Sequence, residues 1–252
     1  MFIVFVNGLT AQKNPPPGTL RLNDSVYIDK HPVTNADYAF FLLCLEQFWN
    51  HAVSDSLNQT DLSRLELPKL QRKYIRDMRW RNNQQLLYNR MQPGKAVYKF
   101  LDSGLTLKQQ LLHPRVKDFP ITGISLEQAV TFCKWRTDMV RIQYAANHKS
   151  EKKKAKHFSY LQYRLPLAGE WMAIQKEKGF LGKQLMNTRL QEEWKLQERF
   201  INYAFSFTEW VEPSGEIHKL AVNDQEKILD MTVPPSENTP MLMGFRCSCD
   251  VR

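Results

Sequence analysis

The chain has 252 residues, of which 42% are hydrophobic and 24% are charged. This composition is that of an ordinary globular protein and excludes a globally disordered chain. The length is sufficient for one large domain or two small ones with a real core. The formal net charge of +9 would suit nucleic acid, an anionic membrane surface or an acidic protein as a partner, and it selects none of them.

The first eighteen residues form a segment of their own. Met1–Val6 is apolar but too short to span a bilayer, and Lys13–Gly18 is rich in proline. We interpret residues 1–18 as a signal-peptide remnant followed by a Pro-rich leader. This interpretation predicts an exported chain in the periplasm or at the periphery of the outer membrane. A short buried N-terminal strand is the alternative, and no later stretch is apolar enough for a transmembrane helix.

A strand and a helix open the remaining chain. Residues 19–28 alternate loosely and predict one strand. Thr34 is a good helix N-cap, and Asp37 stands where it can return the capping bond. A stripe at helical spacing follows, and it favours core packing over a ligand groove. It consists of Tyr38, Phe41, Leu42, Leu45 and Phe48.

Residues 51–118 are polar, basic and weakly patterned, and they predict a basic helical insertion. Basic residues interleave with aromatic ones there, as in proteins that bind single-stranded nucleic acid. No RNA-recognition or helix-turn-helix motif accompanies the pattern, so a solvated insertion whose aromatics face the core is favoured. The residues concerned are Lys69, Arg72, Lys73, Arg76, Arg79, Arg81 and Arg90, with Tyr74, Trp80 and Tyr88.

The later elements mix helices with short strands. Ser125 begins a second helix with a capping box and places Cys133 on its inward face. Tyr163–Trp171 predicts the start of a third helix, and residues 205–211 and 243–249 predict strands. Because no β-α-β alternation appears, we expect an α+β domain over residues 19–252.

Motifs for chemistry are sparse. The six histidines are scattered and no C-x-x-C pair occurs, so no metal, cofactor or catalytic site is predicted from spacing. Cys247 and Cys249 would point the same way in a strand, and a bridge between them would be strained. Glu170 and Glu209 could be general acids, but each stands in a motif beside a tryptophan. A structural carboxylate is therefore favoured at both positions.

Several segments, in order, resemble the formylglycine-generating-enzyme, or sulfatase-modifying factor, domain family. Val26–Tyr38 resembles its opening, in which a strand leads through V-T-N into a helix. Phe119–Trp135 resembles P-V-x-x-V-S-W-x-x-A-x-x-Y-C-x-W, and Tyr163–Trp171 resembles R-L-P-T-E-A-E-W. Phe205–Trp210 and Gly244–Cys247 resemble G-N-V-W-E-W and G-F-R-C.

This resemblance covers residues 19–249 and implies a C-type-lectin-like α+β fold with much irregular backbone. It also implies a set of fold-signature residues. They are Thr34, Asn35, Ser125, Trp135, Arg164, Pro166, Glu170, Trp171, Glu209, Trp210, Gly244 and Arg246.

The departures from the family concern its catalytic parts. Active members carry a copper-binding cysteine pair before G-F-R-C, but residues 222–243 contain no cysteine. Copper chemistry of that kind needs two soft thiolates. Phe205 and Ser206 replace the G-N of a calcium site, and Leu167 replaces a hydroxyl helix cap, which costs about 1 kcal/mol. We therefore expect neither the copper nor the calcium site to be kept.

A finer resemblance concerns one branch of the family. His113-Pro, residues 118–120 and Phe132–Asp138 look like the gliding-motility and type IX secretion lipoproteins of Bacteroidota. Those proteins carry the domain in structural roles, which implies a non-catalytic envelope protein that binds other envelope proteins. A divergent metal-dependent oxidase and a basic nucleic-acid-binding protein are the alternatives, the latter disfavoured. Association with a membrane surface stays open.

The resemblance also implies a disulfide. The cysteines of the Y-C-x-W and G-F-R-C segments form a bridge in some family members, which implies a bond between Cys133 and Cys247. An exported chain would mature in an oxidising compartment, where such a bond persists. Two buried free thiols are the alternative, since cysteine tolerates burial well.

Overall fold

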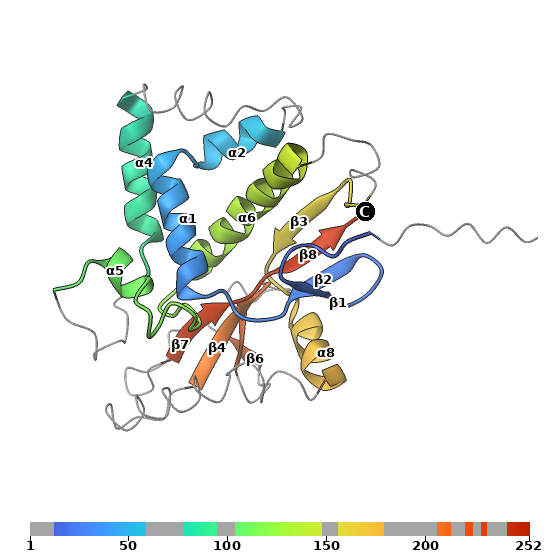
Figure 1. The fold of residues 1–252 in the computed structure, drawn as a ribbon. Helices are drawn as coiled ribbons and strands as arrows, with labels where there is room; N and C mark the ends of the chain where they lie inside the picture. Colours follow the sequence, from blue (N-terminus) through green and yellow to red (C-terminus); the bar gives the residue numbers. More distant parts are fainter. Residues whose placement is uncertain are drawn as a thin grey trace, which may run out of the picture.

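Two four-stranded sheets and a layer of helices build the molecule in the computed structural model (Figure 1). The structure describes residues 13–58, 78–94, 104–147, 156–178, 206–212, 220–223, 228–230 and 241–252. The helices are α1 (Asn35–Gln47), α2 (His51–Asn58), α4 (Met78–Met91), α5 (Leu107–Leu111), α6 (Leu126–Asn147) and α8 (Ala168–Lys178). The strands are β1 (Thr19–Arg21), β2 (Val26–Asp29), β3 (Leu161–Arg164), β4 (Ser206–Val211), β5 (Leu220–Asn223), β6 (Ile228–Asp230), β7 (Met241–Phe245) and β8 (Ser248–Val251).

The first sheet has the order β1-β2-β8-β3 and the second β6-β5-β4-β7. All neighbouring strands pair antiparallel except β4 and β7, which are parallel. Only Arg246 and Cys247 separate β7 from β8, so the chain passes from one sheet to the other within two residues. The mixture of helices and mainly antiparallel strands is the α+β class that the sequence predicted.

Strand boundaries are where the sequence predictions were wrong. Residues 19–28 form a hairpin instead of one strand, because the Asn23 side chain turns the backbone. Its Oδ1 accepts hydrogen bonds from the N–H groups of Ser25 and Val26, at 2.9 Å each. Residues 243–249 likewise divide between β7 and β8. Tyr163 and Arg164 belong to β3, and the third helix begins only at Ala168.

Both predicted capping boxes are present. The Asp37 N–H donates to Thr34 Oγ1 at 3.1 Å, and Thr34 N–H donates back to Asp37 at 3.1 Å. Gln128 and Ser125 exchange the same pair of bonds at the start of α6. Each box satisfies two N–H groups that a helix start would leave without partners. They fix where α1 and α6 begin.

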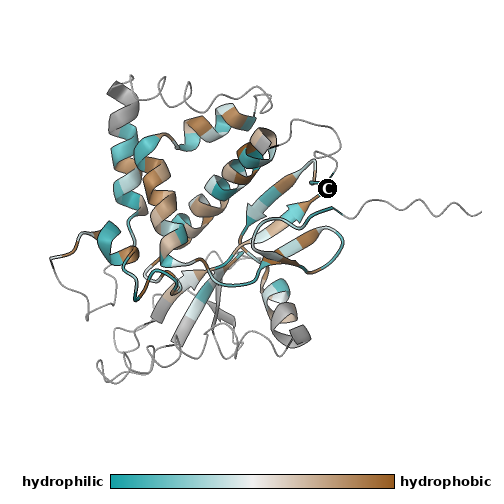
Figure 2. Ribbon diagram, in the orientation of Figure 1, coloured by the Kyte–Doolittle hydropathy of each residue, from teal (hydrophilic) through white to brown (hydrophobic). Residues whose placement is uncertain are grey.

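The core lies between α1, α6 and the seam of the two sheets. The whole stripe predicted on α1 is buried, and Figure 2 shows hydrophobic residues along α1 and α6. Phe132 of α6 stacks on Tyr38 with ring centroids 5.9 Å apart. It also meets Phe245 of β7 edge to face at 5.2 Å. Such aromatic pairs add about 0.5–1.5 kcal/mol each beyond their buried area.

The described helices of the predicted insertion pack on this core. Leu57 of α2, together with Leu87 and Met91 of α4, is buried in it. The Tyr38 hydroxyl donates to the Met91 carbonyl at 2.8 Å, which joins α1 to the end of α4. Tyr88 is partly buried against the same core. These helices are thus part of the fold, while residues 59–77, with several of the interleaved basic side chains, lie outside the described residues.

Within the described residues, no helix has the length and apolar character needed to cross a membrane.

Candidate functional site

A fully buried ion pair lies at the seam between the sheets. Arg246 donates from Nε and Nη2 to the two oxygens of Glu209, both at 2.6 Å. The indole N–H of Trp171 donates to the same carboxylate at 3.0 Å. Arg246 is 0% and Glu209 1% exposed, so the pair is removed from water. Because these residues come from the β7–β8 junction, β4 and α8, the pair joins three elements.

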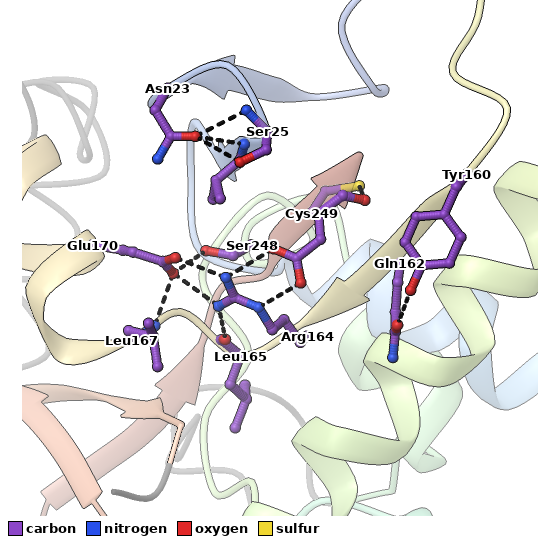
Figure 3. A network of polar contacts seen from close by, with 12 residues as sticks. Asn23, Ser25, Tyr160, Gln162, Arg164, Leu165, Leu167, Glu170, Ser248 and Cys249 are labelled. Carbon is purple, nitrogen blue, oxygen red and sulfur yellow. Dashed lines mark hydrogen bonds and ion pairs between the residues drawn. The ribbon is translucent and has the colours of Figure 1, made fainter. Parts of the chain in front are cut away.

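A second polar network surrounds Arg164 at the end of β3 (Figure 3). Its guanidinium donates two bonds to Glu170, at 2.8 and 2.7 Å, and two to Asp250, at 2.9 Å each. Glu170 also accepts the Leu167 N–H at 2.9 Å and the Ser248 hydroxyl at 3.1 Å. Glu170 thereby makes the carboxylate half of a capping box at the start of α8 and anchors that helix to the first sheet.

The protonation of Glu170 follows from these contacts. Burial raises the pKa of this carboxyl, but the hydrogen bonds from Arg164 and from the Leu167 N–H outweigh burial and lower the pKa below its ordinary value. The carboxylate is therefore ionised at neutral pH and bound on several sides. A general acid would need the opposite shift.

Two of the four cysteines meet in the core. The sulfurs of Cys133 and Cys247 lie 3.4 Å apart as free thiols, so the fold brings together the pair implied by the resemblance. Burial raises the pKa of Cys133 well above its ordinary value and raises those of Cys44 and Cys249 to about 11 and about 12. These three thiols are protonated at neutral pH and are poor nucleophiles in this state.

An ion pair that the sequence reasoning missed lies beside the thiols. Arg136 donates to Asp29 at 2.5 Å, and the same carboxylate oxygen accepts the Cys247 N–H at 2.9 Å. The Arg136 guanidinium also lies 4.3 Å from the ring centre of Tyr163. Asp29 and Arg136 are 107 residues apart in sequence, and no local pattern links them.

The other signature residues hold irregular backbone in place. Asn35 donates to the Val116 carbonyl at 2.7 Å, and Trp210 donates to the Ile124 carbonyl at 2.6 Å. The Pro166 carbonyl accepts the N–H of Glu212, which joins the start of α8 to the end of β4. Trp135 packs its ring on Phe41 and Phe132, and Gly244 lies opposite Glu209 in the β4–β7 pair.

A cleft of about 560 Å³ with a mixed polar and apolar lining lies between α2, α6 and β3. Several of its charged or polar groups are already paired. Lys134 binds Asp55 at 3.1 Å, Arg141 binds Asn58, and Asp138 accepts the Trp49 indole N–H at 2.9 Å. A second cleft of about 460 Å³ lies beside α1 and α6 and has a more apolar lining that includes Phe40 and Trp135.

The residues present do not fit the copper of the active enzymes. All four cysteines of the chain are buried, with at most 3% of any one exposed. A thiolate pair that acts on another protein's cysteine must be open to that substrate. Phe205 of the expected calcium position lies outside the described residues, and Ser206 is the first residue of β4. Among the described residues, no three His, Cys, Asp or Glu side chains are grouped to hold a metal.

Comparison with known proteins gives one match. A model of the sulfatase-modifying factor enzyme 1-like domain matches residues 4–217. No curated protein matches the chain significantly. No solved structure does so either.

The buried ion pair predicts a large cost when one partner is removed. Glu209→Leu leaves the Arg246 charge buried without its counter-charge, so we expect a loss of about 3–5 kcal/mol in the free energy of unfolding. The double variant Glu209→Leu/Arg246→Met should lose less free energy of unfolding than the two single variants lose together. Urea unfolding of the four proteins measures both effects. Strict additivity would contradict the direct coupling.

The Arg164 network predicts a pH dependence. The pKa of Glu170 is lower in the folded state than in the unfolded chain, where it is near 4.3. Its contribution is therefore present above the unfolded pKa and is lost as the pH falls through the folded one. Glu170→Gln should lower stability at neutral pH and flatten the loss of stability below about pH 5. Thermal unfolding across pH tests this, with the exposed Glu127→Gln as the control.

Proposed function

We propose that this chain, which belongs to the sulfatase-modifying factor enzyme 1-like domain family, is a non-catalytic member that acts at the cell envelope by binding other proteins. The observation that carries the proposal is the position of its cysteines. Every cysteine in the sequence is buried in the core, and the stretch before G-F-R-C contains none. The chain therefore lacks the thiolate pair that the family's oxidation of a substrate cysteine requires.

The signature carboxylates support the same conclusion. Glu209 is bound by Arg246 and Trp171, and Glu170 is bound by Arg164, Ser248 and a backbone N–H. A carboxylate whose oxygens are occupied in this way holds structure and has little freedom to transfer protons. The motifs shared with the enzymes thus stabilise the fold. A stable fold can present a binding surface to partners.

The envelope location rests on the sequence. The apolar Met1–Val6, the Pro-rich leader and the resemblance of Phe132–Asp138 to the gliding and type IX secretion branch all favour export. A place in a secretion or gliding assembly is the finer form of the proposal. Fractionation of the native host would test it, because recovery in the cytoplasm would contradict export.

The absence of oxidase activity can be measured directly. Purified protein loaded with copper and incubated with a cysteine-containing peptide in air should yield no aldehyde product by mass spectrometry. A family member that keeps the cysteine pair serves as the positive control. Stoichiometric copper binding with turnover would overturn the proposal and favour the divergent oxidase.

The thiol pair predicts a disulfide in the exported protein. We expect non-reducing peptide mapping to find Cys133 bonded to Cys247, since their sulfurs already touch in the core. The bond would span 114 residues and stabilise the fold by about 4–5 kcal/mol through the entropy of the unfolded chain. Reduction should lower the stability of the wild type and leave Cys133→Ser/Cys247→Ser unchanged. Free thiols at both positions, or a bond to Cys249, would contradict the prediction.

A further inference from the structure

One member of the buried thiol pair borders the larger of the two clefts. This cleft of about 560 Å³ runs along α6 and β3, which lie side by side in Figure 1. The Tyr163 N–H of β3 donates to Thr137 Oγ1 of α6 at 2.9 Å, so the two elements meet directly. Cys133, one turn before Thr137 on α6, is among the residues that line the cleft. A cysteine of the core thus also forms part of the floor of a surface cleft.

Exposure alone does not distinguish the four cysteines, but the cleft does. Cys44 is 3% exposed, Cys133 is 2% exposed, and Cys247 and Cys249 are 0% exposed. Cys133 lines the larger cleft, whereas the other three line neither of the two clefts described above. Val130, one turn earlier on α6 and 49% exposed, lies at the rim of the same cleft. A small molecule that passes Val130 therefore meets Cys133 before any other cysteine.

Cys247 lies behind Cys133 and supplies the second thiol. Its sulfur is 3.4 Å from that of Cys133, so the two atoms are in contact. The Cys247 N–H donates to Asp29 at 2.9 Å, which holds this cysteine in place. In thiol–disulfide exchange, one sulfur reacts with the reagent and a neighbouring sulfur then displaces it. The order of exposure to the cleft assigns the first step to Cys133 and the second to Cys247.

The size and lining of the cleft determine the class of reagent. Its volume lies within the range of about 300–1,000 Å³ that is typical of small-molecule sites. Its charged residues have both signs, with Lys134 and Arg141 on α6 and Glu212 after β4, so the lining does not select one sign of charge. A sulfur at the floor of a cleft is out of reach of the surface thiol of a folded oxidoreductase. The cleft therefore suits a low-molecular-weight disulfide or thiol.

We propose that Cys133 is a modification site for low-molecular-weight disulfides that enter through this cleft, and that Cys247 then displaces the attached half of the reagent. In the first step the Cys133 thiolate attacks one sulfur of the reagent, the S–S bond of the reagent breaks, and one half leaves as a thiolate. In the second step the Cys247 thiolate attacks the Cys133 sulfur, and the other half leaves as a thiolate. The two protein thiols lose two electrons and two protons, which convert the reagent into two thiols.

This inference concerns the route to the Cys133–Cys247 bond. It goes beyond the proposed function and does not depend on it, because exchange and oxidase activity are measured separately. Burial and the neighbouring Cys247 raise the pKa of Cys133, and the charge of Arg136 offsets this only in part. The thiolate is therefore scarce at neutral pH, and we expect exchange to be slow there and faster in mildly alkaline solution.

The test is the reaction of the reduced full chain with bis(2-hydroxyethyl) disulfide, an uncharged reagent, followed by acid quenching and peptide mapping. The wild type should form the Cys133–Cys247 bond. In Cys247→Ser, the mixed disulfide should accumulate at Cys133, because no second thiol displaces it. Cys247 in Cys133→Ser should react at least about tenfold more slowly than Cys133 does in Cys247→Ser. Cys44 is the internal control, because it is as exposed as Cys133 but lines neither cleft, and it should stay free.

Two further variants test the cleft and keep all four cysteines. Val130→Phe narrows the rim and should slow formation of the Cys133–Cys247 bond severalfold. Leu86→Phe also places a phenylalanine at an exposed helix position, but this position on α4 does not line the cleft, so the rate should equal that of the wild type. Thermal unfolding checks that each variant folds.

Entry through the cleft also predicts a rate that changes little in dilute urea, because the folded protein reacts. Three outcomes would overturn the proposal. A rate that rises steeply with urea and is equal at Cys44, Cys133 and Cys247 would show that the reagent reaches the thiols only after unfolding. Faster modification of Cys247 than of Cys133 would reverse the order of the two steps. Equal rates in Val130→Phe and the wild type would show that the cleft is not the route.

Discussion

The ion pair between Glu209 and Arg246 is the contact on which the arrangement of both sheets depends. Arg246 lies between β7 and β8, where its guanidinium is sealed from water. A buried guanidinium without a counter-charge would cost several kcal/mol. The chain can therefore cross from one sheet to the other here only if β4 supplies Glu209 as the counter-charge, and Trp171 of α8 donates to the same carboxylate. Charge compensation thus joins the β7–β8 junction to β4, and the indole hydrogen bond adds α8 to the same carboxylate.

The residues that follow Arg246 extend this coupling. The backbone of Cys247 binds Asp29, Ser248 binds Glu170, and Asp250 binds Arg164. One short segment thus holds the hairpin, the start of α8 and strand β3 by successive residues. Its motif resembles that of an enzyme family, and the contacts named here join strands and a helix of the fold. That is the physical reason why such a motif can persist when the cysteine pair of the chemistry is absent.

The parts that the sequence predicted correctly depend on near neighbours. Thr34 with Asp37 and Ser125 with Gln128 are three residues apart, so both caps could be read from spacing. The stripe on α1 follows from helical periodicity in the same way. The resemblance also indicated Arg164, Glu170, Glu209 and Arg246, although not which partner each would bind. Asp29 and Asp250 were missed because their partners, Arg136 and Arg164, lie 107 and 86 residues away.

The basic residues of the chain fall into two groups, those paired inside the fold and those exposed on its surface. Carboxylates inside the fold bind Arg136, Arg164 and Arg246, so these charges are neutralised in ion pairs that stabilise the structure. Lys13 and Arg252 lie over aromatic rings, and Lys156 and Arg252 are exposed to solvent. Ion pairs inside the protein help to determine the fold and add little to the electrostatic field outside the molecule. Exposed charges, in contrast, act on a partner over about a Debye length. Exposed cations, unlike those paired inside the fold, can therefore attract an anionic partner.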